Sequence, residues 1–215
     1  MTQVSAYGAV RPDAPMQAVK IERRELGPDD VAIDITHCGI CHSDLHYARG
    51  EWGEQPSPAV PGHEIVGVVR AVGANVTKHK VGDRVGVGCM VDSCRACEAC
   101  QDGEEQFCTT QTGTYMGVER QTGLPTYGGY SKAIVVTQDF VLHIPDGLKS
   151  EHAAPLLCAG ITTYSPLRHW KVEKGQKVGV VGLGGLGHMA VKLAKAMGAH
   201  VVVFTTSPGK VADAK

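Results

Sequence analysis

The chain has 215 residues, of which 43% are apolar and 20% charged, as in ordinary globular proteins. Its 21 Lys and Arg residues nearly balance its 22 Asp and Glu residues, so the net charge of -1 attracts neither nucleic acid nor an acidic membrane strongly. Aromatic residues make up only 5% of the chain, which argues against a base-stacking surface. The sequence contains no apolar run of roughly 18–20 residues and no secretory signal. We therefore expect a cytoplasmic globular protein without a nucleic-acid or membrane partner.

Residues 1–149 have the pattern of short strands separated by Gly and Pro turns, which favours a barrel or a sandwich. Residues 31–36 read as alternating apolar and polar, so Val31, Ile33 and Ile35 are expected to share one face of a half-buried strand. The strands that we expect span residues 31–36, 64–72, 81–88, 130–136 and 140–144. Residues 98–121 lack any periodicity, so we expect a long loop or lobe that needs something to order it.

The pattern changes near Ser150, which is predicted to cap a short helix that Pro155 breaks or kinks. A second helix is expected over 161–170. The later elements are a buried strand at 177–181, a loop at 182–187, a helix that Gly198 ends, and a buried strand at 200–204. These elements form a βαβ unit of a parallel sheet. Because two strands and one helix cannot cover both faces of such a sheet, we expect the chain to stop inside its second domain.

Four of the eight cysteines crowd into fifteen residues, with the spacing C-x2-C-x2-C-x7-C at Cys94, Cys97, Cys100 and Cys108. Four thiolates so close together match a closed, tetrahedral structural zinc site. An iron–sulfur cluster is the main alternative, but its bacterial motif has a last gap of three residues followed by Pro. Zinc binding would also order the lobe, because metal affinity supplies folding free energy to such a segment.

Cys41, His63, Glu64 and Cys158 are the remaining plausible metal ligands, and they lie far apart in the sequence. Each also has a simpler interpretation. Cys158 lies in an apolar segment where cysteine usually serves as a small hydrophobic residue. His63 follows Pro61 and Gly62, where its side chain could simply form a hydrogen bond to a turn. Spacing alone therefore leaves open whether these residues form a catalytic zinc site.

Five segments follow one another in a characteristic order, and together they resemble the zinc-dependent medium-chain alcohol dehydrogenases. They are CGICHSDLH at 38–46, PGHE at 61–64, the cysteine quartet, PLLCAG at 155–160 and GLGGLG at 182–187. The likeness is greatest to the cinnamyl-alcohol-dehydrogenase-like branch of NADP-dependent aldehyde reductases. It extends over nearly all of the chain.

The resemblance implies a mixed α and β fold with two domains. Residues 1–150 would form a GroES-like, partly open β-barrel catalytic domain with a structural-zinc lobe at about 89–122. Residues 151–215 would begin a Rossmann-type NADP-binding domain that is truncated. Two Zn²⁺ ions per chain are implied, one structural in the quartet and one catalytic on Cys41, His63 and Cys158, with Glu64 beside it.

The resemblance also assigns roles in catalysis. The catalytic ion would polarise the substrate oxygen, with Ser43 as the first proton relay and His46 as the outer acid or base. Asp44 would hold the free nitrogen of His63. Ser43 and Asp44 could instead cap a helix, and the two roles can coexist. Glu64 would either fill the open zinc position at rest or stand behind the ligands. The other histidines, including His79 and His143, are expected to be surface or packing residues.

The glycine-rich segment follows a predicted strand and opens a helix, which is the context of a dinucleotide site. Gly182 would allow the tight turn, Gly184 the approach of the pyrophosphate, and Gly187 close packing of helix on strand. Gly185 and Leu186 complete the loop, and Thr162 is expected at the nicotinamide end by resemblance. The second strand ends without a carboxylate, so its hydroxyl and ammonium groups favour the 2′-phosphate of NADP. These groups belong to Thr205, Thr206, Ser207 and Lys210.

Taken together, the sequence predicts a zinc-dependent alcohol dehydrogenase, mainly an aldehyde reductase, that uses NADP(H) and a small aldehyde or alcohol. Two alternatives belong to other classes: a non-catalytic zinc-binding fragment of such an enzyme, and an iron–sulfur electron carrier. The resemblance implies a homodimer for full-length members of the family. It leaves the oligomeric state of this chain open, since the dimer edge is expected in strands that the chain lacks.

Overall fold

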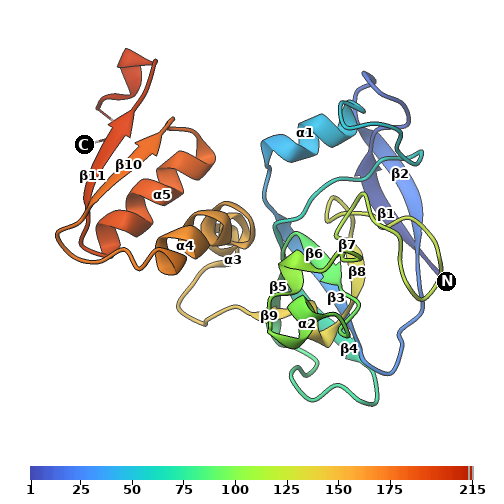
Figure 1. Cartoon of the computed structure of the whole chain (residues 1–215). Coiled ribbons are helices and arrows are strands. Elements are labelled where there is room, and N and C mark those ends of the chain that lie inside the picture. Colours follow the sequence, from blue (N-terminus) through green and yellow to red (C-terminus); the bar gives the residue numbers. More distant parts are fainter. Residues whose placement is uncertain (213, 215) are drawn as a thin grey trace. The chain divides into compact units, whose positions relative to one another are not determined.

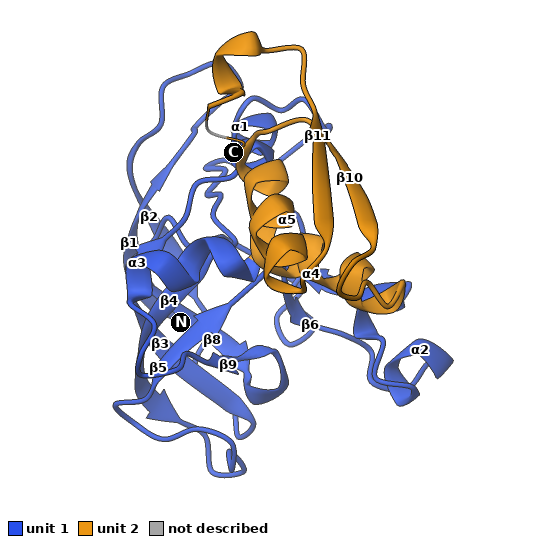
Figure 2. Ribbon diagram, turned by 90° about the vertical axis from the view of Figure 1, so that its left-hand side faces the viewer, with its two compact units in different colours: residues 1–157 blue, residues 158–215 orange. Residues whose placement is uncertain are grey.

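The computed structural model describes residues 1–212 and 214. The chain divides into two compact units, Met1–Leu157 and Cys158–Lys215, which have separate colours in Figure 2. Within the described residues, none of the helices combines the length and the apolar character needed to cross a bilayer.

The first unit is built mainly from antiparallel strands (Figure 1). Its strands are β1 (Thr2–Gly8), β2 (Gln17–Arg23), β3 (Asp30–Cys38), β4 (Ile65–Val72), β5 (Arg84–Val87), β6 (Met90–Asp92), β7 (Thr112–Gly113), β8 (Ala133–Thr137) and β9 (Leu142–His143). Five of them form one sheet in the order β8-β3-β4-β5-β9, whereas β1 pairs with β2 and β6 with β7. A bridge between Ala6 and Ser131 links the β1–β2 hairpin to the segment that leads into β8.

One face of the five-stranded sheet supplies the main core of this unit. The predicted alternation holds in β3 only from Ile33 to Thr36. Val31 and Ala32 are both buried, so both faces of the strand are covered near its start. Buried aliphatic side chains from β3, β4, β5, β8 and the residue before β9 pack together: Val31, Ile33, Ile65, Val69, Val85, Val87, Ile134, Val136 and Val141. The core thus holds in place the strands from which the candidate ligand loops emerge.

The helices of the first unit are short. They are α1 (His42–Ala48), α2 (Glu98–Gln101), α3 (Ser150–Ala153), and the 3-10 helices η1 (Glu105–Phe107), η2 (Gln138–Phe140) and η3 (Ala154–Leu157). The prediction that Ser150 caps a helix is wrong, because Ser150 is the first residue of α3 and Lys149 stands at the N-cap. Pro155 does end the α-helical turn, which continues as the tighter η3.

The second unit contains the predicted βαβ pattern. Its elements are α4 (Ala159–His169), β10 (Lys177–Val181), α5 (Gly185–Ala196), β11 (His200–Phe204) and η4 (Pro208–Lys210). Strands β10 and β11 are parallel, as expected, with Lys177 opposite His200. Gly198 follows the end of α5 with φ of +84°, which agrees with its predicted role as a helix stop.

The prediction that both of these strands are buried is wrong. Exposed and covered side chains alternate along them, and Val181 and Phe204 are 87% and 57% exposed. Helix α5 contacts β10 and β11 and covers one set of side chains. Within the described residues, the side chains on the opposite face have no such cover. A sheet is buried only when a layer packs on each of its faces, so these side chains stay exposed.

Several strand boundaries also differ from the predictions. Strand β5 begins only at Arg84, because Lys80–Asp83 is a turn in which Gly82 has φ of +91°. Strand β9 is only two residues long, because η2 occupies the residues before it. Four strands were missed altogether: β1, β2, β6 and β7. In β1 the buried face consists of Val4, Ala6 and Gly8, whose small side chains give a weak alternation signal.

We expect Ile65→Ala to lower the free energy of unfolding of the first unit by about 2–5 kcal/mol, since it leaves a cavity in the main core. Ile65 is 0% exposed and contributes to the core from β4. Val68→Ala on the same strand is the control, because Val68 is 37% exposed and its truncation should cost less than about 1 kcal/mol. Urea unfolding measures both values, and equal losses would contradict the packing described here.

Candidate functional site

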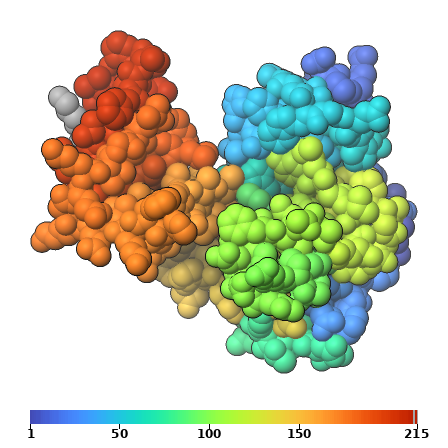
Figure 3. Space-filling view, viewed as in Figure 1, coloured from blue at the N-terminus to red at the C-terminus, as the bar shows by residue number. Residues whose placement is uncertain are grey.

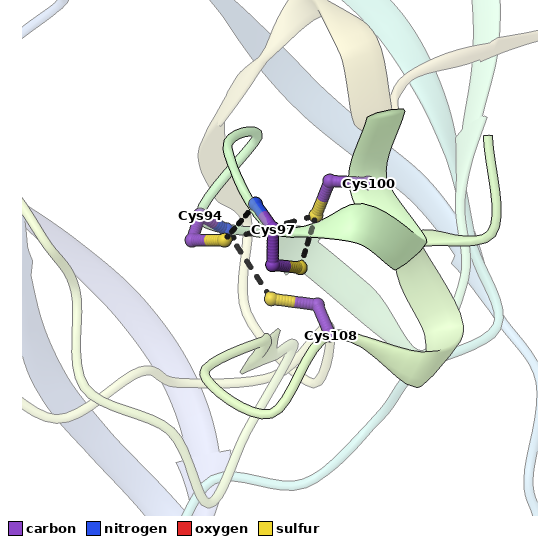
Figure 4. A group of neighbouring side chains, drawn as sticks. All are labelled: Cys94, Cys97, Cys100 and Cys108. Carbon is purple, nitrogen blue, oxygen red and sulfur yellow. Dashed lines mark hydrogen bonds between the residues drawn. The ribbon is translucent and has the colours of Figure 1, made fainter. Parts of the chain in front are cut away.

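The cysteine quartet lies in a lobe of the first unit between β6 and β7, coloured green in Figure 3. The residues predicted to form a loop here instead contain α2, η1 and β7. The four sulfur atoms of Cys94, Cys97, Cys100 and Cys108 lie within 4.8 Å of one another. Figure 4 shows the four side chains pointing toward a common centre.

Backbone N–H groups around the quartet favour thiolates. The N–H of Cys97 lies 3.3 Å from the sulfur of Cys94, and the N–H of Cys94 lies 3.4 Å from the sulfur of Cys108. Hydrogen bonds from the backbone of Ala96 and Cys97 lower the pKa of Cys94, and a bond from the Cys94 backbone lowers that of Cys108 to about 6. The backbone of Cys100 also lowers the pKa of Cys97, but the sulfurs of Cys94 and Cys100 raise it to about 12. Several thiolates in one place repel each other, and a bound cation would relieve that repulsion.

A second group of ligand atoms comes from residues that are far apart in the sequence. One ligand atom from each of Cys41, His63, Glu64 and Cys158 lies within 4.8 Å of the others. Cys41 caps the N-terminus of α1, and His63 and Glu64 directly precede β4. Leu157 packs in the first unit, and Cys158 is the next residue. The peptide bond between them therefore keeps Cys158 next to the first unit.

Three of these four side chains are buried: His63, Glu64 and Cys158 are 5%, 4% and 8% exposed. Burying a carboxylate and an imidazole is costly unless each is paired with a compensating group. Glu64 lies against Gly39, where a Cβ atom would collide with its carboxylate, and the N–H of Gly39 donates to the Glu64 carbonyl oxygen at 3.0 Å. Only glycine at position 39 leaves room for the carboxylate in this place.

Asp44 lies behind the ligand group and is 2% exposed. Its carboxylate accepts hydrogen bonds from the N–H of Cys41 at 2.9 Å, the N–H of Gly62 at 2.9 Å and the hydroxyl of Tyr130 at 3.1 Å. The same carboxylate lies 3.2 Å from Nδ1 of His63, which is the contact expected from the sequence. It also performs the capping role considered for it, since Cys41 is the N-cap of α1.

The environment of Asp44 keeps its carboxylate ionised. Burial alone would raise the pKa of Asp44, but the bonds from His63, Cys41 and Gly62 lower it below its ordinary value. Burial raises the pKa of Tyr130 and Tyr115, and the charge on Asp44 raises both further, so both phenols stay protonated. Neither tyrosine was predicted from the sequence, because neither lies within a motif.

The two residues expected to relay a proton both lie on α1, and both are partly exposed. Nδ1 of His46 contacts the carboxylate of Glu51, and the His46 ring lies 5.2 Å from the ring of Trp52. The hydrogen bond from His46 lowers the pKa of Glu51 below its ordinary value. Glu51 was not predicted from the sequence. Its position five residues after His46, just beyond a short helix, could have indicated this contact.

Cys38 is the last residue of β3 and is half-buried. Burial raises its pKa to about 12, so this thiol stays protonated, and it belongs to neither ligand group. None of the eight cysteines, all of which lie in described residues, forms a disulfide.

The glycine-rich segment of the second unit joins β10 to α5. The sequence places all of 182–187 in a loop, whereas α5 already begins at Gly185, with Gly184 at the N-cap. Gly182 has φ of +85°, and a Cβ atom at Gly187 would collide with the carbonyl oxygen of Gly182. In contrast, a Cβ atom at Gly184 or Gly185 would meet nothing within 4 Å. The loop is therefore tight at its base and open where a phosphate would approach.

The residues expected to bind the far end of the nucleotide follow β11. Thr205 and Thr206 are exposed, and the hydroxyl of Thr205 accepts a bond from the N–H of Ser207 at 3.1 Å. Nζ of Lys210 donates to the carbonyl oxygen of Leu183 at 2.9 Å, so it lies beside the glycine loop. Thr162 lies elsewhere, exposed on α4, and Leu186 lies in the first turn of α5.

Because Asp44 accepts bonds from several separate segments, we expect Asp44→Ala to destabilise the first unit by at least about 3 kcal/mol. Its loss would leave buried donors unpaired at about 1–3 kcal/mol each. Asp34→Ala is the control, since Asp34 is exposed and makes only a 3.3 Å contact with Arg70. Urea unfolding should show a large loss for the first variant and less than about 1 kcal/mol for the second.

Comparison with known proteins shows high similarity along the whole chain. It is 60% identical over 215 residues to NADP-dependent alcohol dehydrogenase C 1 of Mycolicibacterium smegmatis, covering 99% of this chain and 61% of the relative. It is 56% identical over 214 residues to aldehyde reductase YahK of Escherichia coli, covering 99% of this chain and 61% of that protein. The chain thus spans about three fifths of the length of the curated relatives it matches.

Solved structures and a family model support the same assignment. The structure of CAD from Helicobacter pylori complexed with NADP(H) matches with a TM-score of 0.95 and 49% identity, covering 99% of this chain and 62% of that one. The family model described as "Alcohol dehydrogenase GroES-like domain" matches residues 27–146. These matches confirm the mixed α and β fold with a GroES-like domain that the motifs indicated. The chain belongs to the alcohol dehydrogenase family with a GroES-like domain.

Proposed function

We propose that this protein is a zinc-dependent, NADP-dependent alcohol dehydrogenase that mainly reduces aldehydes. The observation that carries the proposal is the group formed by Cys41, His63, Glu64 and Cys158, with Asp44 on the second nitrogen of His63. Similarity to proteins named NADP-dependent alcohol dehydrogenase and aldehyde reductase supports it. Small aldehydes and alcohols are the proposed substrates.

The donor set fits zinc. Two thiolates and one imidazole are a known ligand set for a catalytic zinc ion that keeps a fourth position open. We propose that Cys41, His63 and Cys158 hold the ion and that Glu64 stands at the fourth position or directly behind it. When bound, zinc supplies Lewis-acid polarisation of the substrate oxygen, and NADPH supplies the hydride.

The other residues of this site position the ligands and handle the proton. Asp44 accepts from Nδ1 of His63, which leaves Nε2 with the lone pair for the metal. We propose that Ser43 takes up or delivers the proton at the substrate oxygen and that His46 exchanges it with solvent. Glu51 holds Nδ1 of His46 in this scheme, so Nε2 of His46 would be the exchanging nitrogen.

The quartet is proposed to hold a structural zinc ion. Four sulfurs within 4.8 Å fit a tetrahedral ion with Zn–S distances of about 2.3 Å. A four-thiolate site has no position left for substrate, so its role would be to order the lobe between β6 and β7. Reduced thiols are stable in a reducing compartment, which supports the prediction of a cytoplasmic protein. The homodimer expected for full-length members of the family stays a prediction.

NADP(H) is the proposed cofactor. The open space at Gly184 and Gly185, at the start of α5, suits a pyrophosphate that backbone N–H groups contact. Lys210 and the hydroxyls after β11 are proposed to bind the 2′-phosphate, because no carboxylate stands there to repel it. The printed description of the Helicobacter pylori structure as a complex with NADP(H) supports this choice.

We expect the protein, once purified and dialysed against zinc-free buffer, to contain two zinc ions per chain by metal analysis. We also expect it to oxidise NADPH with aliphatic or aromatic aldehydes. Cys41→Ser should lose one zinc ion and essentially all activity, while the quartet keeps its ion. Cys100→Ser should lose the other ion and lower the thermal midpoint, because the lobe would lose its order.

The matched control is Cys89→Ser, which lies outside both ligand groups and should keep two zinc ions and full activity. Undiminished turnover in Cys41→Ser would reject the catalytic assignment. Two zinc ions and NADPH binding without turnover in the wild type would favour the non-catalytic zinc-binding alternative instead.

We further expect Lys210→Ala to weaken NADPH binding tenfold or more while NADH binding changes little. A charge-assisted hydrogen bond contributes about 1.5–3 kcal/mol, and only NADPH carries the 2′-phosphate. Nucleotide fluorescence titration gives both affinities, with the exposed Lys192→Ala on α5 as the control. Parallel losses for both nucleotides would disprove the role assigned to Lys210.

A further inference from the structure

We propose that His79, Asp83 and His143 form a third metal site in the first unit, which binds a divalent transition metal ion such as Zn²⁺. One ligand atom of each residue lies within 4.8 Å of the others. This group shares no residue with the quartet or with the group around His63. Both histidines were expected from the sequence to be surface or packing residues.

The fold brings the three residues together from two segments. Lys80–Asp83 is a turn closed by a bond from the N–H of Asp83 to the carbonyl oxygen of Lys80 at 3.1 Å. His79 precedes this turn and Asp83 ends it, so both lie at the entrance to β5. Strand β9 pairs with β5, with His143 opposite Val85, and the two imidazole rings lie 4.5 Å apart.

The hydrogen bonds of the two histidines leave Nδ1 of each ring available to a metal ion. Nε2 of His79 lies 3.2 Å from the carbonyl oxygen of Val141, and Nε2 of His143 lies 2.8 Å from that of Lys78. A carbonyl oxygen can only accept, so Nε2 carries the proton in both rings. The Nδ1 atom of each neutral ring therefore keeps its lone pair. Metal-binding histidines are commonly oriented by this kind of backbone contact.

The environment of Nδ1 of His79 also points to a bound cation. His79 is only 7% exposed, and Nδ1 is buried without a hydrogen-bond partner in the structure. A buried polar atom without a partner costs free energy, and a cation beside it would remove that cost. Asp83 is half-buried and His143 is exposed, so an ion has access from the His143 side.

Asp83 supplies the negative charge that a cation needs. One oxygen of Asp83 accepts from the N–H of Lys80 at 2.9 Å, which leaves the other oxygen for a metal. Nζ of Lys78 pairs with Asp139 at 2.6 Å, so its positive charge is balanced. Two imidazoles and one carboxylate suit zinc and neighbouring transition metals better than Ca²⁺ or Mg²⁺, which prefer oxygen ligands.

Ligand atoms around one zinc ion lie about 3–4 Å apart, since each bond measures about 2.0–2.2 Å. The group would thus close slightly on binding, which the exposed ring of His143 allows. The ion would fasten β9 to the start of β5. The ion would stabilise this pairing, which is short, because the two strands share only the register pairs Val85–His143 and Gly86–Leu142.

The test uses the full chain purified with its zinc and dialysed against zinc-free buffer. Isothermal titration with ZnCl₂ should show one further equivalent of Zn²⁺, and the thermal midpoint should rise as it binds. His143→Ala should weaken this binding at least tenfold and remove the rise. Asp83→Asn should also weaken it, although its amide oxygen still accepts from the N–H of Lys80 and preserves the turn.

The matched control is His152→Ala, an exposed histidine on α3 outside the group, which should bind the further Zn²⁺ as the wild type does. Absence of a further equivalent in the wild type overturns the proposal. Unchanged affinity in both His143→Ala and Asp83→Asn also overturns it, since the ion would then bind elsewhere. Aldehyde reduction is not part of the readout, so the result is independent of the proposed function.

Discussion

The contacts of the Asp44 carboxylate hold together the segments that present the ligands. It accepts from the backbone at Cys41 and Gly62, contacts the ring of His63 and binds the hydroxyl of Tyr130. These residues come from the start of α1, the approach to β4 and the approach to β8. Burying a carboxylate costs free energy because the charge loses its water. Each hydrogen bond that Asp44 accepts offsets part of that cost.

The other two ligand groups show the same principle at different degrees of burial. In the quartet, backbone N–H groups at 3.3 and 3.4 Å from the sulfurs of Cys94 and Cys108 favour thiolates before any ion binds. At His79 and His143, backbone carbonyls fix the proton on Nε2. In both groups, hydrogen bonds with the backbone therefore favour the protonation state in which these side chains could bind a metal ion.

The second unit depends on backbone conformation more than on charge. Gly182 turns the chain with φ of +85°, and Gly187 lets the first turn of α5 approach the carbonyl oxygen of Gly182. The exposed side chains of Val181 and Phe204 show that α5 covers only one face of this small sheet. The nucleotide loop therefore forms from local sequence, while burial of its strands requires further layers.

Spacing along the chain was sufficient to identify the quartet, the strand–glycine loop–helix pattern, and β10 and β11 to the residue, because these features are local. Local patterns were not sufficient for β1, whose buried face is built from small residues, or for Ser150, where Lys149 proved to be the N-cap. The sequence by itself determined the family to which the chain belongs and the residue types available as metal ligands. Only the tertiary structure decided which distant residues meet, such as Asp44 with Tyr130 and His79 with His143, because strand pairing and loop packing create contacts that no local pattern encodes.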